Sequence, residues 1–412
     1  MNESTPLKLA VIGAGPVGLA LALHAASALP DAEVTLFDAR PSTKDVSGDP
    51  RTLALSLGSV QLLQRLGAWR PENAQPIAEV HVSQQAPSLA AAFTSRFGEP
   101  ALSIRARDEG VPLLGAVLSY GSIVAPLQQV WLEAERAEPQ RLHSRFGTPV
   151  SALKSVQHGV EIDAGIAERF DLVVIAEGGV FAERSAAAQA GAALATLPRG
   201  PLKHDYAQTA WVGQVTFSDD ARRAPGVAFE RFTRHGPAAL LPLKGGRAAL
   251  VWCVASDDDP VRELDDAQRV AVLNSIFPEA AGHIAAISPL KDFALGLIAE
   301  RTLTDGRTVR IGNAAQTLHP VAGQGLNLGL RDAFELVQAL RRDPDVDAVL
   351  RRLEWQRGPD RWAMIAATDF LARSFTWKLP GAGAARGLGI AALQALSPLK
   401  SAIARQMMFG RR

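Results

Sequence analysis

The chain has 412 residues, with 43 Lys and Arg against 42 Asp and Glu, so its net charge is close to zero. This length suits two or three compact units or one interrupted domain. The balanced charge argues against a basic nucleic-acid-binding surface across the molecule, and we expect no nucleic-acid partner. The single cysteine, Cys253, excludes an internal disulfide framework and a cysteine cluster for zinc or iron–sulfur. We expect a buried thiol there, and the sequence predicts no metal site.

The first predicted elements are a strand, a glycine-rich turn, a helix and a second strand. Residues 7–12 are apolar except for Lys8, residues 13–18 read Gly-Ala-Gly-Pro-Val-Gly, a helical pattern continues to about Leu29, and the strand 33–37 ends at Asp38. This is the order of parts in a dinucleotide-binding βαβ unit. It predicts that an adenine dinucleotide binds here, and it does not distinguish FAD from NAD.

Each residue of this motif has an expected physical role. Gly13 permits the tight turn, Gly15 lets the backbone approach a pyrophosphate, and Gly18 allows the helix to pack closely on the strand. The start of the helix offers unpaired N–H groups to phosphates. Asp38 is placed to accept hydrogen bonds from an adenosine ribose.

Two stretches, Leu9 to Pro30 and Val111 to Leu132, are uncharged and long enough to raise the question of a membrane span. Both are interrupted by glycines and prolines. We interpret each as a buried strand running into a helix.

The middle of the chain predicts a second sheet. Four short runs rich in Val, Phe, Trp and Leu, and bounded by Gly, Pro and Asp, are typical of an antiparallel sheet; they are Ala210–Phe217, Gly226–Phe232, Ala238–Leu243 and Ala248–Val254. An acidic, mixed segment, residues 257–269, predicts a solvated helix. The alanine-rich residues 182–195 predict a loop or helix between domains.

A second glycine-rich segment follows near the C-terminal end. A strand at residues 308–311 leads into a polar, glycine-dense loop, residues 312–332, and a helix is predicted from Ala333 to about Leu340. Such a loop can direct several backbone N–H groups, and the partial positive charge of the helix, at an electron-rich ring edge. It would stabilise an anionic reduced flavin at its pyrimidine side. His319 in this loop is either an ordinary loop histidine or functional, since nothing in the sequence pairs it with a carboxylate.

Residues 370–412 contain seven basic residues and no acidic one, with apolar residues at roughly helical spacing. Such a segment can lie at an anionic bilayer surface. It can equally form a terminal helical layer packed on the rest of the chain or on a partner, and both interpretations stay open. Its longest uncharged run, residues 387–399, is too short to span a membrane.

Several distant strings together resemble the FAD-dependent aromatic hydroxylases, the p-hydroxybenzoate hydroxylase-like flavoproteins. Within that family the chain most resembles the ubiquinone-biosynthesis hydroxylases of the 2-polyprenyl-6-methoxyphenol hydroxylase type. The resemblance covers nearly the whole chain. The strings that carry it are residues 49–56 (DPRTLALS), 229–237 (FERFTRHGP), 250–253 (LVWC) and the segment 312–332.

The resemblance implies an α/β fold in which a discontinuous, Rossmann-like FAD-binding domain carries an inserted antiparallel β-sheet substrate domain and a C-terminal helical region. The implied FAD-binding domain comprises residues 1–75, 103–185 and 296–345. The implied substrate domain comprises residues 76–102 and 186–295, laid over the flavin, and residues 346–412 form the helical region.

The resemblance also implies roles for individual residues around FAD. Gly13, Gly15 and Gly18 would hold the pyrophosphate and Asp38 the ribose. The remaining implied positions are Arg51 beside the phosphates or ribityl chain, Glu177 near FAD and the nicotinamide cofactor, Asn313 at the ribityl hydroxyls, Pro320 near the reactive edge of the flavin, and Gly323, Gly325, Leu326 and Asn327 in the loop that faces its pyrimidine ring. Pro320 and Gly325 are the positions implied in the catalytic environment.

This sequence departs from the family pattern at two of these positions. The family has Gly-Ala-Asp-Gly after the strand 170–175, where this chain has Ala176-Glu177-Gly178, and the wider family has aspartate at the position of Asn313. Glu177 is one methylene longer than aspartate. Asparagine can still hydrogen-bond a hydroxyl.

The activity implied is hydroxylation of a polyprenylated phenol in ubiquinone biosynthesis, with FAD, NAD(P)H as co-substrate and molecular oxygen. The sequence identifies no base for the phenol proton. Two alternatives stay open: a hydroxylase of a small soluble aromatic with the same fold, and a catalytically degenerate member that scaffolds a biosynthetic complex. We expect a cytoplasmic protein whose C-terminal region meets either the cytoplasmic face of the inner membrane or other proteins of the ubiquinone pathway.

Overall fold

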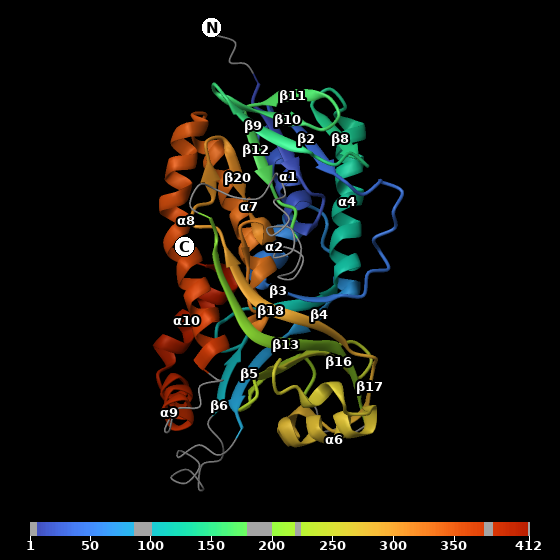
Figure 1. Cartoon of the computed structure of the whole chain (residues 1–412), viewed down its shortest axis with the longest axis vertical. Helices are drawn as coiled ribbons and strands as arrows, with labels where there is room; N and C mark the ends of the chain where they lie inside the picture. The colour runs from blue at the N-terminus through green and yellow to red at the C-terminus, as the bar shows by residue number, and fades with distance from the viewer. Residues whose placement is uncertain (1–5, 86–100, 179–199, 219–223, 375–381, 411–412) are drawn as a thin grey trace.

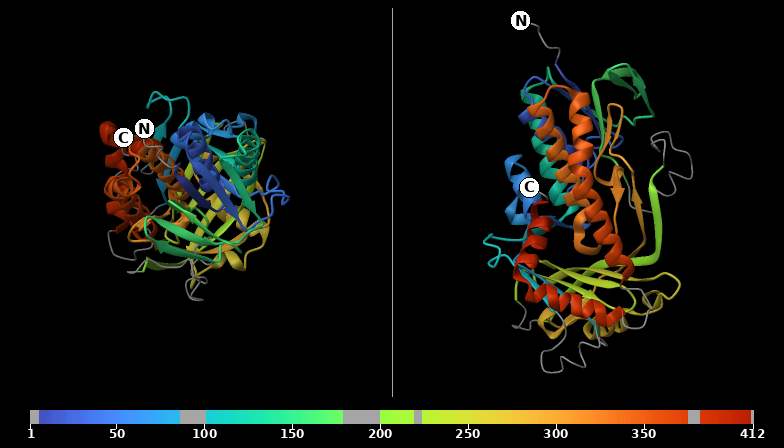
Figure 2. Two further views of the ribbon diagram at one scale, coloured as in Figure 1. Left: turned by 90° about the horizontal axis from the view of Figure 1, so that it is seen from above. Right: turned by 90° about the vertical axis from the view of Figure 1, so that its left-hand side faces the viewer.

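The computed structural model describes residues 6–85, 101–178, 200–218, 224–374 and 382–410. The molecule is elongated, with a mainly parallel sheet near one end, a larger sheet toward the other, and the C-terminal helices along one side (Figures 1 and 2). The alanine-rich segment 182–195, predicted as a loop or helix, lies outside the described residues.

The first sheet has six strands in the order β19-β20-β12-β1-β2-β8. Every neighbouring pair is parallel except β19 with β20. The central strands are the most apolar because both of their faces are covered: all four residues from Leu9 to Ile12 are buried, and so are all four of the strand Leu172–Ile175. The strands are β1 (Lys8–Ile12), β2 (Glu33–Asp38), β8 (Leu142–Phe146), β12 (Leu172–Ile175), β19 (Thr304–Asp305) and β20 (Thr308–Arg310).

Three helices pack beside this sheet: α1 (Pro16–Ala28), α4 (Tyr120–Ala137) and α7 (Gln324–Arg342). Pro16 at the first position of α1 suits a helix start, where its missing N–H has no partner to lose. Helix α1 follows β1, and α4 follows β7 (Gly115–Ser119). The interpretation of both uncharged stretches as a buried strand running into a helix is therefore confirmed.

The second sheet has nine strands, and its neighbouring pairs are antiparallel except β5 with β14. The four strands predicted from residues 210–254 are all present and pair in antiparallel fashion, as predicted. The strands are β5 (Glu79–Gln84), β6 (Ala101–Arg105), β13 (Leu202–Phe217), β14 (Val227–Phe232), β15 (Pro237–Leu243), β16 (Arg247–Ala255), β17 (Ile284–Ile287), β18 (Lys291–Ala299) and β21 (Gln316–Thr317).

The helix predicted for residues 257–269 was placed wrongly. Helix α6 runs from Asp266 to Ile276. Asp265 caps it: its carboxylate accepts the Gln268 N–H at 2.8 Å, and the Gln268 side chain reaches back to the Asp265 N–H. This capping box fixes the helix start. Leu273 and Ile276 then pack against one face of the nine-stranded sheet.

The remaining strands form two small sheets of three strands each. One has the order β3-β7-β4, with β3 at Thr52–Ser56 and β4 at Gln75–Ile77. Helix α2 (Leu57–Arg65) begins directly after β3, where the Ser56 hydroxyl accepts the Ser59 N–H and caps the helix. The other small sheet comprises β9 (Ala152–Val156), β10 (Gly159–Asp163) and β11 (Ala167–Phe170).

The C-terminal region consists of α8 (Val346–Ser374), α9 (Ala382–Ala395) and α10 (Ser397–Phe409). In Figure 2, α8 runs along one side of the molecule from the end with the parallel sheet to the level of the nine-stranded sheet. Among the described residues, no single helix is both long and apolar enough to cross a membrane. Residues 385–409 of α9 and α10 meet the length and composition only as a pair, and that pair is bent by 95°.

The two large sheets draw most of their strands from different ranges of the predicted division into domains. Those of the parallel sheet come from the three ranges assigned to FAD binding, and those of the nine-stranded sheet come mainly from the two ranges assigned to substrate binding. Strand β21 is an exception, since it lies in the third FAD-binding range and joins the larger sheet through β18. The division into domains itself stays a prediction.

Candidate functional site

The two glycine-rich segments lie against each other. A Cβ placed on Gly312 would come 3.2 Å from a methyl carbon of Val17, and one on Gly329 would come 2.7 Å from the Gly312 Cα. Helices α1 and α7 pack side by side below this contact. Almost 300 residues of intervening chain therefore separate two loops that meet at the carboxyl ends of β1 and β20.

The first glycine loop is shaped by its own close packing. Gly13 has φ +104°, and a Cβ there would lie 2.6 Å from the Glu177 backbone nitrogen. A Cβ on Gly18 would lie 1.9 Å from the Gly13 carbonyl oxygen. Gly15 differs, because a Cβ there would meet only the Tyr120 hydroxyl, at 3.7 Å. The loop thus needs glycine for packing at 13 and 18, and it has an open side at Gly15.

Asp38 braces this loop from the end of β2. Its carboxylate accepts the Ala14 N–H at 2.6 Å and the Arg40 N–H at 2.8 Å. The Arg40 guanidinium pairs with the same carboxylate at 3.0 Å and donates to the Ala14 carbonyl at 2.7 Å. Burial works against the charge of Arg40, but hydrogen bonding and charge attraction from Asp38 outweigh it and raise its pKa. The ribose contact of Asp38 stays a prediction.

Glu177 lies where three distant segments converge. It follows β12, and its backbone borders Gly13, while a Cβ on the next residue, Gly178, would come 2.9 Å from the Ala314 nitrogen and the Asn313 carbonyl carbon. Burial, and then the negative charge of Asp38, raise the pKa of the Glu177 carboxyl. The structure therefore brings Glu177 and Asn313, the two departures from the family pattern, to one place beside the first glycine loop.

Arg51 lies at the rim of this region. It pairs with Asp49 at 2.8 Å and stacks over the ring of Tyr120 at 4.2 Å. Tyr120 begins α4, and its hydroxyl is the atom nearest the open side of Gly15. The sequence analysis did not single out Tyr120 or Arg40. The position of Arg40, two residues after Asp38, was the available signal.

The second glycine-rich segment turns into helix earlier than predicted. The helix α7 begins at Gln324 rather than at Ala333, after Gly323 caps it in the left-handed conformation at φ +59°. Residues 325–333 continue the helix because Leu330 and Ala333 are buried in the core shared with α1. Gly325, Leu326 and Asn327 consequently form the first turn of α7, where backbone N–H groups have no partner within the helix.

Within that first turn, Gly325 faces open space: a Cβ there would meet no atom within 4 Å. The Asn327 side chain instead points into the protein. Its oxygen accepts the Ser56 N–H at 2.7 Å and the Ser59 hydroxyl at 2.8 Å, and its nitrogen donates to the Ala54 carbonyl at 3.0 Å. Asn327 thus ties α7 to β3 and α2, and a contact of this residue with a flavin ring stays a prediction.

Pro320 is exposed and lies just before a short 3-10 turn, residues 321–323, that leads into α7. His319 beside it is 1% exposed. Its Nδ1 accepts the Val321 N–H at 3.2 Å, and its Nε2 lies 3.1 Å from the Gln208 side-chain oxygen on β13. Burial lowers the pKa of His319 to about 4. His319 is therefore neutral at physiological pH, and the sequence analysis did not identify Gln208 as its partner.

Apolar residues of the nine-stranded sheet and α8 gather above the Pro320 turn. Val321 and Phe232 form a small buried cluster, with Val82 and Leu371 packed against it. Cys253 on β16 is buried, and burial raises the pKa of its thiol, so the expectation of a buried strand thiol is confirmed. The aromatic residues Trp211, Phe217, Phe229 and Trp252 lie in one core of this sheet.

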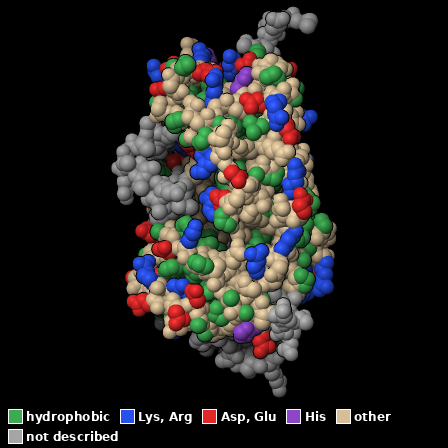
Figure 3. Space-filling view, turned by 90° about the vertical axis from the view of Figure 1, so that its right-hand side faces the viewer, with side chains coloured by type: hydrophobic (Ala, Val, Ile, Leu, Met, Phe, Trp, Pro, Cys, Tyr) green, Lys and Arg blue, Asp and Glu red, His purple; other side chains and the backbone are tan. Residues whose placement is uncertain are grey.

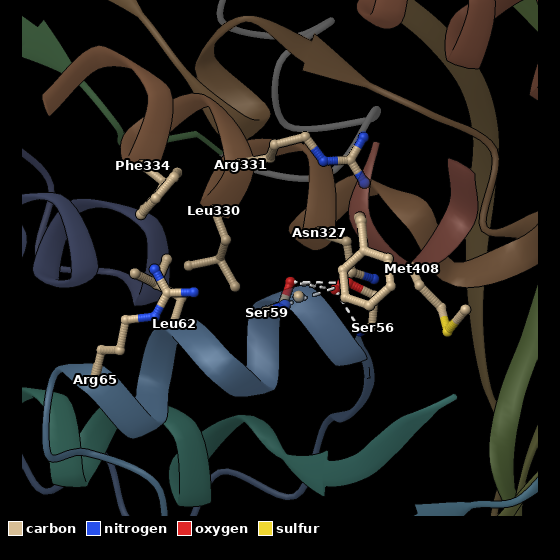
Figure 4. Close-up of a pocket in the computed structure, with 11 residues that line it drawn as sticks. Ser56, Ser59, Leu62, Arg65, Asn327, Leu330, Arg331, Phe334 and Met408 are labelled. Carbon is tan, nitrogen blue, oxygen red and sulfur yellow. Dashed lines mark hydrogen bonds between the residues drawn. The ribbon is translucent and has the colours of Figure 1, made fainter. Parts of the chain in front are cut away.

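The space-filling view in Figure 3 shows a hollow in one face of the molecule, with Lys and Arg side chains around it. A separate, small cavity of about 20 Å³ lies between α2, α7 and α10. Figure 4 shows Ser59 and Asn327 hydrogen-bonded at its floor, with Arg65 and Arg331 on either side. This cavity has room for about one water molecule, and it is distinct from the surface between the glycine loops.

Comparisons with known proteins agree with this geometry. A family model described as an FAD binding domain matches residues 201–353, which include the second glycine-rich segment. The ubiquinone hydroxylase UbiL of Rhodospirillum rubrum is 31% identical to this chain over 97% of this chain and 88% of its own length. The 3-demethoxyubiquinol 3-hydroxylase of Escherichia coli is 29% identical over 96% of both chains.

Solved structures show the same fold. The p-nitrophenol 4-monooxygenase PnpA from Pseudomonas putida superposes with a TM-score of 0.70 at 16% identity, over 99% of this chain and 100% of that one. The Klebsiella pneumoniae protein HpxO, complexed with FAD and uric acid, superposes with a TM-score of 0.67 at 18% identity, over 98% and 97%. The predicted α/β fold with an antiparallel second sheet and a C-terminal helical region is confirmed.

Proposed function

Because this chain belongs to the ubiquinone hydroxylases, a family of FAD-dependent aromatic monooxygenases, we propose that it hydroxylates the ring of a polyprenylated phenol in ubiquinone biosynthesis. FAD is its cofactor, NAD(P)H supplies the electrons as is typical of the family, and molecular oxygen supplies the oxygen atom. The observation that carries the proposal is the meeting of the two glycine loops, at residues 13–18 and 312–327, at one edge of the parallel sheet.

The residues present fit a bound FAD. The open side of Gly15 at the start of α1 leaves room for a pyrophosphate to approach the backbone, and the first-turn N–H groups of α1 suit its negative charge. Asn313 and Glu177 lie together beside the same loop. The start of α7, with Gly325 bordered by open space, can place backbone N–H groups and partial positive charge against a flat ring.

In this arrangement the protein supplies binding, orientation and electrostatics. Bound FAD would supply the redox chemistry: NAD(P)H would provide two electrons and the phenol ring two, so that one atom of O2 enters the ring and the other leaves as water. The α7 start would stabilise negative charge on the pyrimidine side of the ring, and the apolar cluster at Val321 and Phe232 would exclude water from the oxygen-transfer side. We assign no general base for the phenol proton.

The proposal is tested with the full chain purified together with FAD. We expect a yellow protein whose flavin absorbance is bleached by NAD(P)H without oxygen, and whose NAD(P)H consumption in air is coupled to hydroxylation of a long-chain prenylated phenol. Preference for an unprenylated phenol would favour the alternative of a small soluble substrate. Protein that takes up no FAD would instead favour the degenerate, scaffolding alternative. Deleting the gene and determining the mass of the accumulated quinone precursor by mass spectrometry would identify the ring position that is hydroxylated.

We further propose that the C-terminal helices bring the enzyme to the cytoplasmic face of the inner membrane, where a lipid-like substrate resides. Leu388, Leu396 and Leu399 are 62%, 53% and 46% exposed on α9 and α10, in a region of the sequence that carries basic and no acidic residues. Exposed apolar and basic groups together suit an anionic bilayer surface. Other faces of these helices pack on the protein, since Ile390, Ala404 and Met408 are buried.

Vesicle binding tests this second proposal. We expect the enzyme to sediment with vesicles that contain anionic phosphatidylglycerol and to release at high salt, and we expect Leu388→Glu with Leu399→Glu to weaken binding severalfold. The control is Ile166→Glu, which changes an 83% exposed residue in the turn between β10 and β11. Equal binding of wild type and the double variant would reject the membrane role of α9 and α10.

A further inference from the structure

A continuous chain of buried hydrogen bonds joins the Pro320 turn to the nine-stranded sheet and to α8. The Val321 N–H donates to Nδ1 of His319 at 3.2 Å, which requires that the ring proton of the neutral imidazole sit on Nε2. That Nε2 lies 3.1 Å from Oε1 of Gln208. The Gln208 amide nitrogen in turn donates to the Ala372 carbonyl of α8 at 3.2 Å.

The donor and the acceptor of the hydrogen bond between His319 and Gln208 follow from the other hydrogen bond that each side chain makes. Gln208 uses its nitrogen toward Ala372, so its oxygen is the atom that can accept from His319. His319 uses Nδ1 as an acceptor, so Nε2 is the atom that can donate. His319 and Gln208 are 1% and 3% exposed. Because a buried polar group without a partner costs about 1–3 kcal/mol, neither side chain can turn away cheaply.

An irregularity of β13 presents Gln208 to His319. The pairing of β13 with β18 shifts register between Asp205 and Gln208, and Ala207 within this bulge has φ +50°, which a residue with a side chain rarely adopts. Bulges of this kind redirect a side chain and are frequent beside active sites. Tyr206 in the same bulge packs edge-on against the His319 ring at 5.3 Å, and its hydroxyl donates to Asp369 of α8 at 3.1 Å.

The charged groups near the ring leave the imidazole neutral. Asp369 is engaged by the Tyr206 hydroxyl and by Arg373, and no carboxylate hydrogen-bonds the ring in the part of the chain that the structure describes. Burial accordingly lowers the pKa of His319 to about 4. The ring therefore acts as a fixed donor and acceptor and needs no change of protonation.

We propose that His319 is a positioning residue for the proposed monooxygenase reaction: together with Gln208 it fixes the Pro320–Gly323 turn against the substrate-side sheet and α8. The proposal rests on the proposed function, in which this turn borders the flavin and the phenol. Its physical content is that the position of the turn depends on a neutral imidazole that bridges Val321 and Gln208. His319 itself exchanges no proton with the substrate.

The central experiment compares His319→Leu, His319→Gln and Gln208→Leu in the full chain with FAD. A glutamine amide can accept from Val321 and donate to Gln208, whereas leucine can do neither. We expect His319→Leu and Gln208→Leu to lower kcat for hydroxylation about tenfold, with KM for the phenol little changed and with more NAD(P)H spent on peroxide. We expect His319→Gln to recover most of the rate and coupling.

The control is His81→Leu, which removes a half-buried histidine from β5 of the nine-stranded sheet, where its Nδ1 lies 3.3 Å from the Ser103 hydroxyl on β6. We expect this variant to lose some stability and to keep its coupling of NAD(P)H consumption to hydroxylation. Coupling lost equally in His81→Leu and His319→Leu would show a general effect of destabilisation and would overturn the positioning role. Wild-type kinetics and coupling in His319→Leu would also overturn it.

Hydrogen exchange tests whether His319 fixes the Pro320–Gly323 turn, and this test does not depend on the hydroxylation reaction. In the FAD-free chain, we expect the peptide that contains Val321 to exchange faster in His319→Leu than in wild type and His319→Gln. An equal exchange rate of this peptide in all three proteins would reject the proposal that His319 fixes the turn. A wild type that takes up no FAD would contradict the proposed function, while this exchange measurement would still decide on His319. If both leucine variants fail to fold, ¹⁵N spectra of the wild-type histidine rings decide, because a proton on Nδ1 of His319 would reject the inference.

Discussion

At the scale of single residues, the glycines of the site differ in what a side chain would meet. Gly13 and Gly18 face protein backbone, so they are required by the fold, whereas Gly325 faces open space. We predict that Gly325→Ala leaves the FAD-free protein as stable or up to about 1 kcal/mol more stable, because alanine favours helix. We expect its Kd for FAD to rise severalfold, because the new methyl group occupies the space proposed for the ring. Chemical denaturation and a flavin fluorescence titration measure the two quantities.

Gly358→Ala provides the control for this prediction. Gly358 also lies within a helix, α8, and a Cβ there would also meet no atom within 4 Å. It should show the same gain of helix stability with an unchanged Kd for FAD. If Gly325→Ala likewise leaves the Kd unchanged, the flavin ring does not contact the start of α7.

The lowered pKa values of two histidines, His24 and His319, predict how the stability of the protein depends on pH. Burial lowers the pKa of His24 and of His319 to about 4, and the positive charges of Arg65 and Arg341 contribute at His24. The unfolded chain therefore binds more protons between about pH 6.5 and pH 4, so stability is complete above this window and falls as pH decreases through it. For His319 the loss between about pH 7.5 and pH 5 is on the order of 2 kcal/mol.

Urea unfolding at these two pH values checks this prediction in wild type and His319→Gln. Because glutamine does not titrate, the variant should lose less stability on acidification. A loss equal to that of wild type would mean that His319 is not held neutral by the fold.

At the scale of elements, the sequence predicted most strands and the first helix because their apolar patterns are local. It failed at the start of α7, where Gly323, Gly325 and the polar Asn327 were interpreted as loop. Burial of the leucines against α1 overrides the weak helix propensity of glycine there, and Asn327 finds its hydrogen-bond partners in α2 and β3. Contacts between elements distant in sequence decided this boundary, and a local pattern does not contain them.

Helices α7 and α8 are joined by a buried ion network that yields a prediction at the same scale. Arg357 pairs with Asp332 and Asp360 at 2.7 Å each, and Arg331 pairs with Asp360 at 3.0 Å, with all four side chains less than 10% exposed. Burial tends to raise the pKa of Asp360, but Arg331 and Arg357 outweigh it and lower the pKa. Removing one partner leaves a buried charge without compensation.

We therefore expect Arg357→Leu to lower the free energy of unfolding by about 3–5 kcal/mol. The control is Arg405→Leu: the Arg405 side chain is 71% exposed and its guanidinium lies 3.9 Å from the Glu109 carboxylate, so its loss should cost at most about 1 kcal/mol. Urea titration of both variants measures the difference. Similar small losses in both would mean that the network adds little to the packing of α7 on α8.

At the scale of the whole molecule, the family resemblance implied one discontinuous FAD-binding domain that contains both glycine-rich segments, and the structure brings these two segments into contact. The sequence could not predict which side chains would close the site between them. Arg40 holds Asp38, Tyr120 borders Gly15, and Gln208 reaches His319 only through a bulge in β13. None of these contacts leaves a periodic pattern in the sequence, since each depends on how separate segments pack.

The last helix, α10, contacts the proposed flavin site through α2, and this contact allows a prediction about the molecule as a whole. A Cβ on Gly58 in α2 would lie 2.8 Å from the Met408 carbonyl, so the end of α10 packs directly on the backbone of α2. The adjacent Ser56 and Ser59 are held by Asn327 in the first turn of α7. Displacing α10 should therefore disturb the flavin side of the protein through α2.

We expect Gly58→Ala to increase hydrogen exchange in α10 and to raise the Kd for FAD, because the methyl group cannot fit without moving the Met408 backbone. Gly389→Ala on α9 is the matched control, since a Cβ there would meet no atom within 4 Å, and it should change neither quantity. Faster exchange in α10 with an unchanged Kd would show that α10 and the flavin site are independent. If instead both change together, any ligand or surface that moves α10 can alter flavin binding from the far side of α2.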